Sequence, residues 1–284
     1  MPFFKDSIML ANVSRRDVLR WSAAAPLLAR GLWAQEAAAD PFGGFRMSLA
    51  TYSLRKLPVD QALQETKAFG VKTVEINPVH LPVGSPAEKI QEVKGLLEKS
   101  GIQAYAFGVL YPDKFKESPE KAIRDAFAQA KEVGIRVISA DPDPKHIAFL
   151  EELAVKNDIR VGIHNHGPNS RYDKLEQVQK LIEGRDARIG ATVDIGHYMR
   201  SGEDPVALIR ALGKRMHGFH LKDVKAGQAV VVGKGDLDLV GTLRALREAK
   251  YEGAVSLEYE VKEVEPLEGI RQCLDAVRDA VKKT

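Results

Sequence analysis

The sequence predicts one (β/α)8 barrel, the TIM barrel fold, preceded by a cleavable export signal. The chain has 284 residues, 44% of them hydrophobic and 29% charged, and barrels of this kind need about 250 residues in one domain. From Arg46 onward, short β-rich runs alternate with longer amphipathic runs, which is the pattern of parallel strands joined by crossover helices. Polar residues near the ends of several such runs indicate an active site at the carboxyl face of the barrel.

The first 39 residues differ in kind from the rest and resemble a twin-arginine export signal. A charged stretch with Arg15 and Arg16 is followed by the apolar segment 21–28 and by small residues at 37–39. An amphipathic surface helix with a chance arginine pair is the alternative. We predict export by the twin-arginine machinery and a periplasmic or secreted enzyme. The predicted parts are a signal peptide, 1–39, and one catalytic domain, 40–284.

Charge and cysteine content exclude several kinds of protein. The formal net charge is +3, and removing the first 39 residues, which carry +2, leaves +1, so a nucleic acid or an anionic membrane is not expected as a partner. Cys273 is the sole cysteine, so no intrachain disulfide can form. We expect it to be a buried, inert thiol. No run of 18 apolar residues is present, which excludes an ordinary membrane-spanning helix.

Eight β-rich runs are expected to form the barrel strands. The stretches between them place apolar residues at spacings of three and four, as amphipathic helices do, and several end near Gly101, Gly134 or Gly184. Eight strand and helix pairs favour a closed barrel over an open sheet. The expected strands are 46–52, 72–77, 103–109, 136–141, 160–166, 189–195, 216–221 and 253–259, and the expected helices include 86–100, 118–133, 144–156 and 265–282.

Strand parity predicts which side chains point into the barrel. Successive residues face opposite sides of a strand, and the outer side must be apolar to receive the helices. In the run 160–166, Val161 and Ile163 therefore face outward, and His164 and His166 face inward. The same argument, applied to four further runs, directs these polar residues inward: Glu75, Asp194, His220, Ser256, Glu258 and Glu260.

Four inward residues from four successive strands form a candidate metal site. His164 and His220 offer imidazole nitrogens, and Asp194 and Glu258 offer carboxylate oxygens. Polar groups inside a barrel cost free energy unless they are paired or bound to a metal. This set suits Mn, Co, Zn or Fe, and Mg less well. A divalent ion there would chelate polyol oxygens, polarise a carbonyl group and acidify the neighbouring C–H. A metal-free network of hydrogen bonds is the alternative.

Four segments of the second half carry motifs in a recognisable order: Asp194-Ile195-Gly196-His197, Phe219-His220-Leu221-Lys222-Asp223, Gly233-Lys234-Gly235-Asp236-Leu237-Asp238 and Ser256-Leu257-Glu258-Tyr259-Glu260. They resemble the motifs of the xylose isomerase-like barrel superfamily, the sugar phosphate isomerase/epimerase group. The similarity covers essentially residues 46–283. That group includes ketose epimerases, inosose dehydratase-like lyases, enzymes acting on ketoglycosides and relatives of endonuclease IV. The resemblance therefore implies the fold and leaves the substrate open.

In the epimerases of this superfamily, Glu, Asp, His and Glu bind a divalent ion, often Mn, and both Glu exchange protons with the substrate. Asp194, His220 and Glu258 match the last three positions. The first falls at His164, where the epimerases have Glu. The resemblance implies Mn as the cofactor ahead of Co, Zn, Fe or Mg. It also implies that Glu258 is the base and that His164 is a ligand, or a base when it does not bind metal.

The same comparison suggests roles for other residues at the carboxyl face. His197 resembles the histidine that hydrogen-bonds substrate oxygens. Glu75 resembles the second-strand glutamate of the family and is expected to contact substrate or to orient a ligand, with a structural ion pair as the alternative. His166 is equally placed for substrate contact or for orienting a ligand. Lys222 shares the inward parity of His220 and is expected to stabilise a developing enolate by its charge. A solvated lysine at a strand end is the alternative for Lys222.

The remaining histidines and the glycine-rich segment are expected to have no catalytic role. His80 lies in a loop, His146 on a helix and His217 at a strand start. The segment 233–236 lacks the spacing of a phosphate-binding loop. We interpret it as a mobile rim loop, with Asp238 as the N-cap of the next helix.

These features predict an enzyme that removes a proton next to the carbonyl group of a sugar or keto-sugar, with Glu258 as the base. Epimerisation, aldose–ketose isomerisation and β-elimination all begin with this step. We predict an isomerase or epimerase. The first alternative is a metal-dependent lyase or dehydratase acting on keto-sugars or 3-keto-glycosides, and the second is a non-catalytic sugar-binding barrel. Export favours unphosphorylated sugars, and an oligomer is compatible with the sequence.

Overall fold

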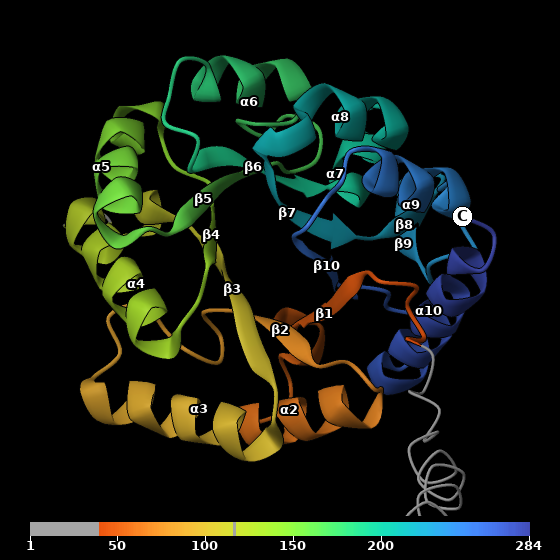
Figure 1. The fold of residues 1–284 in the computed structure, drawn as a ribbon, viewed down its shortest axis with the longest axis horizontal. Coiled ribbons are helices and arrows are strands. Elements are labelled where there is room, and N and C mark those ends of the chain that lie inside the picture. Colours follow the sequence, from red (N-terminus) through yellow and green to blue (C-terminus); the bar gives the residue numbers. More distant parts are fainter. Residues whose placement is uncertain (1–39, 116–117) are drawn as a thin grey trace, which may run out of the picture. The chain divides into compact units, whose positions relative to one another are not determined.

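The structure, a computed structural model, describes residues 40–115 and 118–284, so the predicted export signal lies outside the described residues. Eight parallel strands close into a barrel in the order β1-β10-β7-β6-β5-β4-β3-β2, and helices surround it (Figure 1). Each predicted strand run contains or overlaps one of them. The barrel strands are β1 (Arg46–Ala50), β2 (Thr73–Ile76), β3 (Gln103–Leu110), β4 (Val137–Ala140), β5 (Arg160–His164), β6 (Ile189–Asp194), β7 (Met216–Leu221) and β10 (Ala254–Leu257).

The crossover helices cover the outside of the barrel, as the alternating pattern predicts. Gly101 and Gly134 adopt left-handed backbone, with φ of 71° and 83°, and end two of these helices. Within the described ranges, no helix is long and apolar enough to cross a membrane. The helices are α2 (Val59–Ala68), α3 (Ala87–Ser100), α4 (Pro119–Val133), α5 (Ile147–Asn157), α6 (Leu175–Ile182), α7 (Ile195–Arg200), α8 (Pro205–Leu212), α9 (Leu239–Glu248) and α10 (Pro266–Val281).

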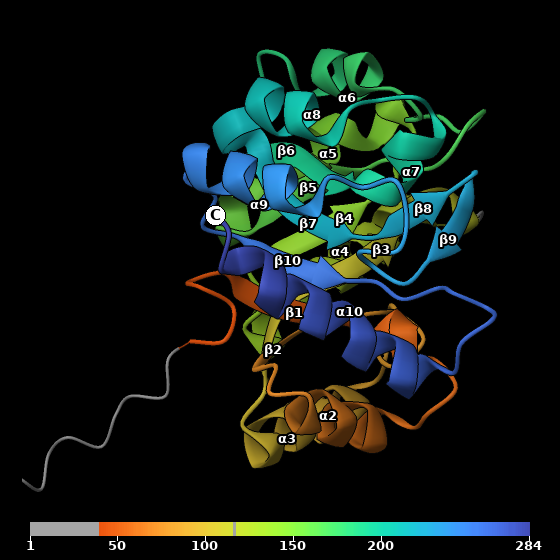
Figure 2. The same ribbon diagram turned by 90° about the vertical axis from the view of Figure 1, so that its right-hand side faces the viewer.

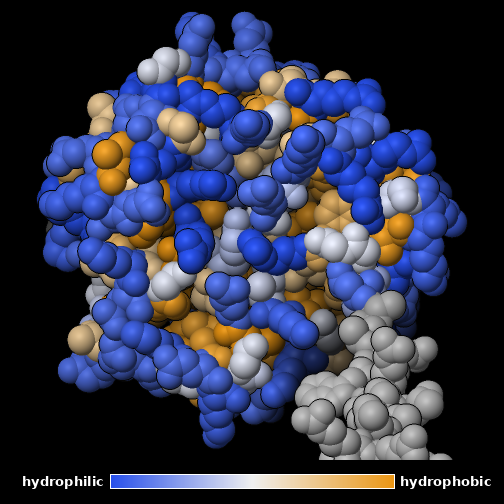
Figure 3. All heavy atoms as spheres, in the orientation of Figure 1, coloured by the Kyte–Doolittle hydropathy of each residue, from blue (hydrophilic) through white to orange (hydrophobic). Residues whose placement is uncertain are grey.

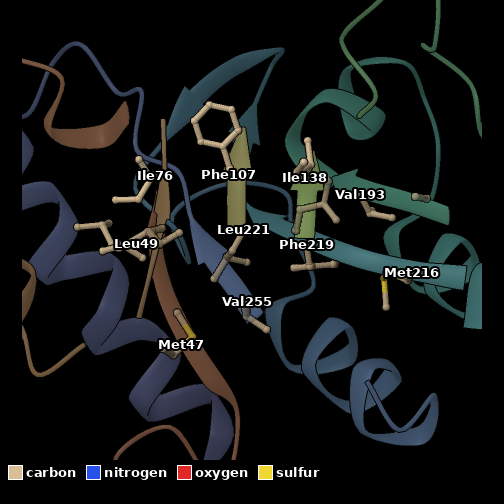
Figure 4. Close-up of a cluster of buried hydrophobic side chains, with 14 of the residues drawn as sticks. Met47, Leu49, Ile76, Phe107, Ile138, Val193, Met216, Phe219, Leu221 and Val255 are labelled. Carbon is tan, nitrogen blue, oxygen red and sulfur yellow. The ribbon is translucent and has the colours of Figure 1, made fainter. Parts of the chain in front are cut away.

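The main hydrophobic core lies between the barrel wall and the helices. Val161, Ile163 and Val193 are completely buried in it, which confirms the outward parity assigned to their strands. Figure 4 shows part of this core, including Phe219 and Val255 from β7 and β10. Burying a side chain of this size stabilises the fold by about 1.5–3 kcal/mol. The apolar outer face therefore fixes the opposite, inward direction of the polar residues.

The barrel interior is narrow directly below the polar residues. Gly162 of β5 and Gly218 of β7 both lie against the side chain of Thr192 of β6. A Cβ atom at either glycine would lie only 2.1 or 2.5 Å from the Thr192 Oγ1 atom. Each of these three residues precedes a candidate metal ligand by two positions and faces the same side of its strand. The small side chains therefore leave room in the barrel for the larger ligand side chains nearer the carboxyl end.

The segment after β7 is more ordered than the sequence suggests. A short antiparallel hairpin, β8 (Asp223–Lys225) and β9 (Gln228–Val230), follows the barrel strand. The buried carboxylate of Asp223 accepts four backbone hydrogen bonds. The donors, at 2.8 to 3.0 Å, are the N–H groups of Val224, Gly233, Gly235 and Leu237. The segment 233–236, predicted to be a mobile rim loop, is thus tied to a buried anion. The prediction that Asp238 caps α9 is confirmed.

Replacing Asp223 is expected to destabilise the fold strongly. Asp223→Ala leaves four backbone donors without their charged acceptor, and each such bond contributes about 1.5–3 kcal/mol. We expect the free energy of unfolding, measured by urea denaturation, to fall by about 3 kcal/mol or more. Asp238→Ala is the matched control, since that carboxylate caps α9 through one N–H group, and its loss costs about 1 kcal/mol. Equal effects of the two substitutions would contradict this account.

The two ends of the barrel differ in chemistry. In the side view of Figure 2, β8 and β9 lie beyond the carboxyl end of β7, and the opposite, amino-terminal face is mainly hydrophilic (Figure 3). A hollow of about 860 Å³ on that face is lined in part by Arg46, Arg136, Arg160 and His217.

His217 has the structural role that the sequence predicts. Its Nε2 atom lies 3.0 Å from the carbonyl oxygen of Ala187. Burial and the charge of Arg160 lower the pKa of His217 to about 4. Its position on the amino-terminal face, opposite the candidate site, is consistent with a structural role.

The other two histidines expected to be non-catalytic contact groups outside the four candidate metal ligands. The Nε2 atom of His80 lies 3.0 Å from the carbonyl oxygen of Leu57, and the buried His146 lies 3.5 Å from Asp113. Cys273 is buried, as predicted. Burial raises the pKa of its thiol to about 12, so the unreactive protonated form is the one present at neutral pH.

Candidate metal centre and active site

The four predicted metal ligands converge at the carboxyl ends of β5, β6, β7 and β10. One donor atom each of His164, Asp194, His220 and Glu258 lies within 4.8 Å of all the others. The His164 Nε2 and His220 Nδ1 atoms are 3.1 Å apart, and His220 Nδ1 is also 3.1 Å from Glu258 Oε2. The convergence predicted from strand parity is therefore present in the fold.

Asp194 and His164 of this cluster have the charge states that ligands of a divalent cation need. Asp194 is fully buried; its Oδ1 atom accepts from the N–H group of His197 at 2.9 Å, and its Oδ2 atom lies 3.0 Å from Lys222 Nζ. Burial raises the pKa of Asp194, but the nearby His197 and Lys222 hold it well below its usual range, so the carboxylate is charged. Burial and His220 lower the pKa of His164, which leaves a neutral imidazole. A buried carboxylate is costly unless a cation balances its charge, and Lys222 supplies one such charge. Two imidazoles and two carboxylates are a ligand set that fits a divalent ion, whose binding would displace the proton from His220 Nδ1.

Glu75 orients one of the imidazoles from behind. Its Oε2 atom lies 2.8 Å from His220 Nε2, which directs the Nδ1 atom toward the other candidate ligands. Burial alone would lower the pKa of His220, but the charges of Glu75 and Glu258 raise it well above its usual value. Glu75 is buried, and it does not line the cavity that opens over the candidate metal ligands. The contact with His220 supports the orientation of a ligand by Glu75, and substrate contact by Glu75 stays a prediction.

Lys222 is buried within the carboxylates, so the alternative of a solvated lysine is wrong. Its Nζ atom lies 3.0 Å from Asp194 Oδ2, 2.9 Å from Glu258 Oε2 and 2.6 Å from Glu260 Oε2. Burial opposes its charge, but these carboxylates raise its pKa well above the usual value. The side chain therefore carries a fixed positive charge that faces the cavity and is suited to stabilise a developing oxyanion.

His166 belongs to a hydrogen-bonded chain that the sequence did not fully reveal. Its Nδ1 atom lies 3.2 Å from Asp141 Oδ2, and its Nε2 atom lies 2.9 Å from the Tyr111 hydroxyl. Burial, with the charges of Glu258 and Asp141, raises the pKa of Tyr111, so the phenol stays protonated. Asp141 is a polar residue at the carboxyl end of a predicted strand, the same pattern that identified Asp194. Tyr111 lies in a loop after β3, where no strand pattern could predict the direction of its side chain.

His197 lies at the edge of the cluster, where substrate contact was predicted. Its backbone N–H donates to Asp194 Oδ1 at 2.9 Å, and its Nδ1 atom lies 3.0 Å from Arg200. Burial lowers the pKa of His197, although Asp194 opposes this. A neutral ring that accepts from Arg200 at Nδ1 carries its proton on Nε2, where it can donate to a ligand oxygen.

A cavity of about 560 Å³ opens directly over these groups. One side is polar and contains His164, His166, His197, Lys222, Glu258 and Glu260. The other side is formed by β3 and the loops after β1, β2 and β3, with apolar and aromatic side chains. The cavity therefore brings five of the predicted site residues to one surface, together with Glu260.

Orientation by Glu75 has a measurable consequence. Glu75→Gln keeps the size of the side chain but removes the charged acceptor of His220 Nε2. We expect the affinity for Mn²⁺, measured by isothermal titration calorimetry, to fall by about 10- to 100-fold, as for other carboxylates behind histidine ligands. Asp141→Asn is the control because it disturbs His166 and contacts none of the four candidate ligands. An unchanged affinity in Glu75→Gln would refute the role given to Glu75.

Comparison with known proteins gives a consistent result. A family model described as xylose isomerase-like TIM barrel matches residues 63–280. Inosose dehydratase from Clostridium tetani is 30% identical over 136 residues, which cover 41% of this chain and 45% of that protein. The match thus spans less than half the length of this curated relative.

Two solved structures share the fold over most of the chain. The IOLI protein with a bound zinc atom has a TM-score of 0.72 and 19% identity, and the match covers 84% of this chain and 99% of that one. The 3-keto-D-glucoside 4-epimerase of E. coli has a TM-score of 0.70 and 16% identity, covering 83% of this chain and 99% of that one. At such identities the likeness concerns the fold.

Proposed function

Since the chain belongs to the xylose isomerase-like TIM barrel family, we propose that it removes a proton next to the carbonyl group of a keto-sugar. The observation that carries this proposal is the cavity in which a four-residue metal site meets Lys222, His166 and His197. A divalent ion held by His164, Asp194, His220 and Glu258 would polarise the carbonyl group and acidify the C–H bond beside it. Mn is the ion we propose, with Co, Zn, Fe and Mg as alternatives.

The side chains around the cavity have complementary tasks in this step. Burial opposes ionisation of Glu258, but Lys222 and His220 lower its pKa, so the carboxylate is available as the base. Lys222 stabilises the negative charge that develops on the carbonyl oxygen. His197 donates a hydrogen bond to a sugar hydroxyl group. Proton removal next to a carbonyl group needs an ionised base and a positive charge for the developing oxyanion, and Glu258 and Lys222 line the same cavity.

The outcome after proton removal depends on the second acid–base group. Two-base epimerisation uses a carboxylate on each face of the substrate, and His164 stands where the second one would be. The chain of Tyr111, His166 and Asp141 instead provides a proton donor. We propose elimination: the C–H proton passes to Glu258, the C–O bond to the leaving group breaks, and the leaving oxygen takes a proton from the pair of Tyr111 and His166.

Relatives support elimination, and isomerisation remains the second candidate. The curated relative is named inosose dehydratase, and dehydration is an elimination of water. The isomerase or epimerase outcome predicted from the sequence is supported by a neighbour of the same fold named as an epimerase. Both outcomes share the first step, so one experiment can test that step and separate them.

That experiment is incubation of the full chain, loaded with Mn²⁺, in deuterated water with unphosphorylated ketoses and 3-keto-glycosides. Elimination predicts that the group bound to the sugar is released and that an unsaturated ketone forms. Mass spectrometry would detect the released group, and ultraviolet absorbance would detect the unsaturated ketone. Epimerisation predicts deuterium at an inverted carbon. Absence of both exchange and cleavage with every candidate would contradict the proposal and favour a sugar-binding protein without turnover.

A further inference from the structure

We propose that the substrate of this site is a sugar joined to an apolar, aromatic group, and that this group lies against the side of the cavity formed by β3 and its neighbouring loops. The inference rests on the proposed function, because it places the sugar part at the candidate metal cluster. It adds the class of substrate, a glycoside of a phenol or of another alcohol that carries an aromatic ring.

The cavity is divided into two sides of different chemistry. The polar side holds the cationic, carboxylate and imidazole groups. The opposite side is mainly apolar and aromatic, with Lys114 over the ring of Tyr111; its apolar and aromatic side chains include Tyr52, Val83, Val109, Tyr111 and Phe115. Sugar hydroxyl groups need hydrogen-bond partners, and a buried hydroxyl without one costs free energy. The second side is therefore suited to a part of the ligand that has no hydroxyl groups.

Three of the polar side chains on the apolar side already make contacts, and one of them, Lys114, places its Nζ atom 3.6 Å from the centre of the Tyr111 ring. The Asn77 side chain donates to the carbonyl oxygen of Gly108 at 2.9 Å and accepts from the N–H group of Val79 at 3.0 Å. The Tyr111 hydroxyl is 2.9 Å from His166. Neither side chain is free to replace the water around a second sugar ring without breaking a bond it already makes.

Phe115 is the second indication of an apolar ligand. It is 38% exposed, which makes it one of four large hydrophobic side chains on the described surface, and it lines the cavity. Large apolar groups at the rim of a pocket commonly mark the place of a ligand. The cavity volume of about 560 Å³ lies within the range of about 300–1,000 Å³ that holds a drug-sized molecule. It is larger than one sugar ring requires.

This placement also agrees with the chemistry of elimination. Tyr111 and His166 stand between the polar side and the apolar side. A leaving oxygen that joins the sugar to the aromatic group would lie at this boundary, next to the proposed proton donor. The apolar side would then hold the departing alcohol, and the polar side would hold the sugar.

Binding of a matched pair of ligands tests the inference. Methyl β-glucoside and phenyl β-glucoside differ only in the group on the sugar, and neither has a carbonyl group, so neither can undergo the proposed step. With the Mn²⁺-loaded full chain in a calorimeter, we expect the phenyl compound to bind about 30-fold more tightly, as burial of one ring predicts. Equal dissociation constants would overturn the inference.

A pair of valine variants locates the effect. Val83→Ser makes the apolar side polar and is expected to reduce the preference for the phenyl compound to about threefold or less, with the affinity for the methyl compound unchanged. Val79→Ser is the control, because Val79 is exposed and does not line the cavity. A preference that survives in Val83→Ser would overturn the inference. Failure of the proposed function would appear differently, as no deuterium exchange with any keto-sugar. No binding of either glucoside would count against both.

Discussion

Glu258→Gln is expected to lower turnover by about 10³-fold while the protein still binds its ligand. The substitution keeps the shape of the side chain but removes the basic oxygen that lies 2.9 Å from Lys222 and 3.1 Å from His220. General base catalysis contributes about 10²- to 10⁴-fold to rates, and the same oxygen belongs to the candidate metal cluster. The loss should therefore appear in kcat more than in KM.

Turnover of Glu258→Gln would be measured by deuterium exchange at saturating Mn²⁺, so that weaker metal binding does not mimic loss of the base. Glu263→Gln is the control, since Glu263 is exposed and lies outside the cavity. If Glu258→Gln kept more than about a tenth of the exchange rate, the assignment of the base would be wrong. Ligand binding without exchange in either form would identify a binding protein.

Asp194→Asn is expected to remove most of the metal affinity and, with it, the activity. Asp194 is fully buried, and its carboxylate supplies one of the four candidate metal ligands. An amide supplies a neutral oxygen in place of a charged one, and first-row divalent ions prefer the carboxylate in a site of this kind. We expect the dissociation constant for Mn²⁺ to rise by at least about 100-fold. This is more than the effect expected from replacing a residue that only orients a ligand, such as Glu75.

The comparison variant for Asp194→Asn is Asp236→Asn, which makes the same chemical change at an exposed position. Metal content after gel filtration and calorimetric titration would report the affinity. Removal of the ion from the unmodified chain by a chelator, followed by its return, should abolish and restore exchange. Full exchange by chelated protein would show that the cluster works as a metal-free network, the alternative considered from the sequence.

Periodicity in the sequence was enough to predict the fold and most of the site. Alternation along the strands placed Val161 and Ile163 outward, and hence His164 inward, because helices must cover an apolar barrel wall. Since the carboxyl ends of all strands meet at one face, residues from four strands could be brought to a common site without knowing their distances. The export signal lies outside the described residues and stays a prediction.

Other features depended on contacts that have no period in the sequence. Asp223 binds a segment ten or more residues away along the chain, and Tyr111 reaches His166 across 55 positions. Loops follow no regular alternation, so their side chains acquire a direction only when the barrel closes. The apolar side of the cavity has the same origin, since it joins loops after three different strands.

The sequence by itself determined the barrel and the inward ring of imidazoles and carboxylates, and its resemblance to the epimerases implied that His164 stands in place of a glutamate. The tertiary structure decided that Lys222 is buried among carboxylates, that Glu75 orients His220, and that His166 pairs with Asp141 and Tyr111. The physical reason is that strand direction is a local property, set by backbone geometry and the need to bury apolar surface. Charge state and hydrogen bonding depend on every neighbour that folding brings within a few ångströms.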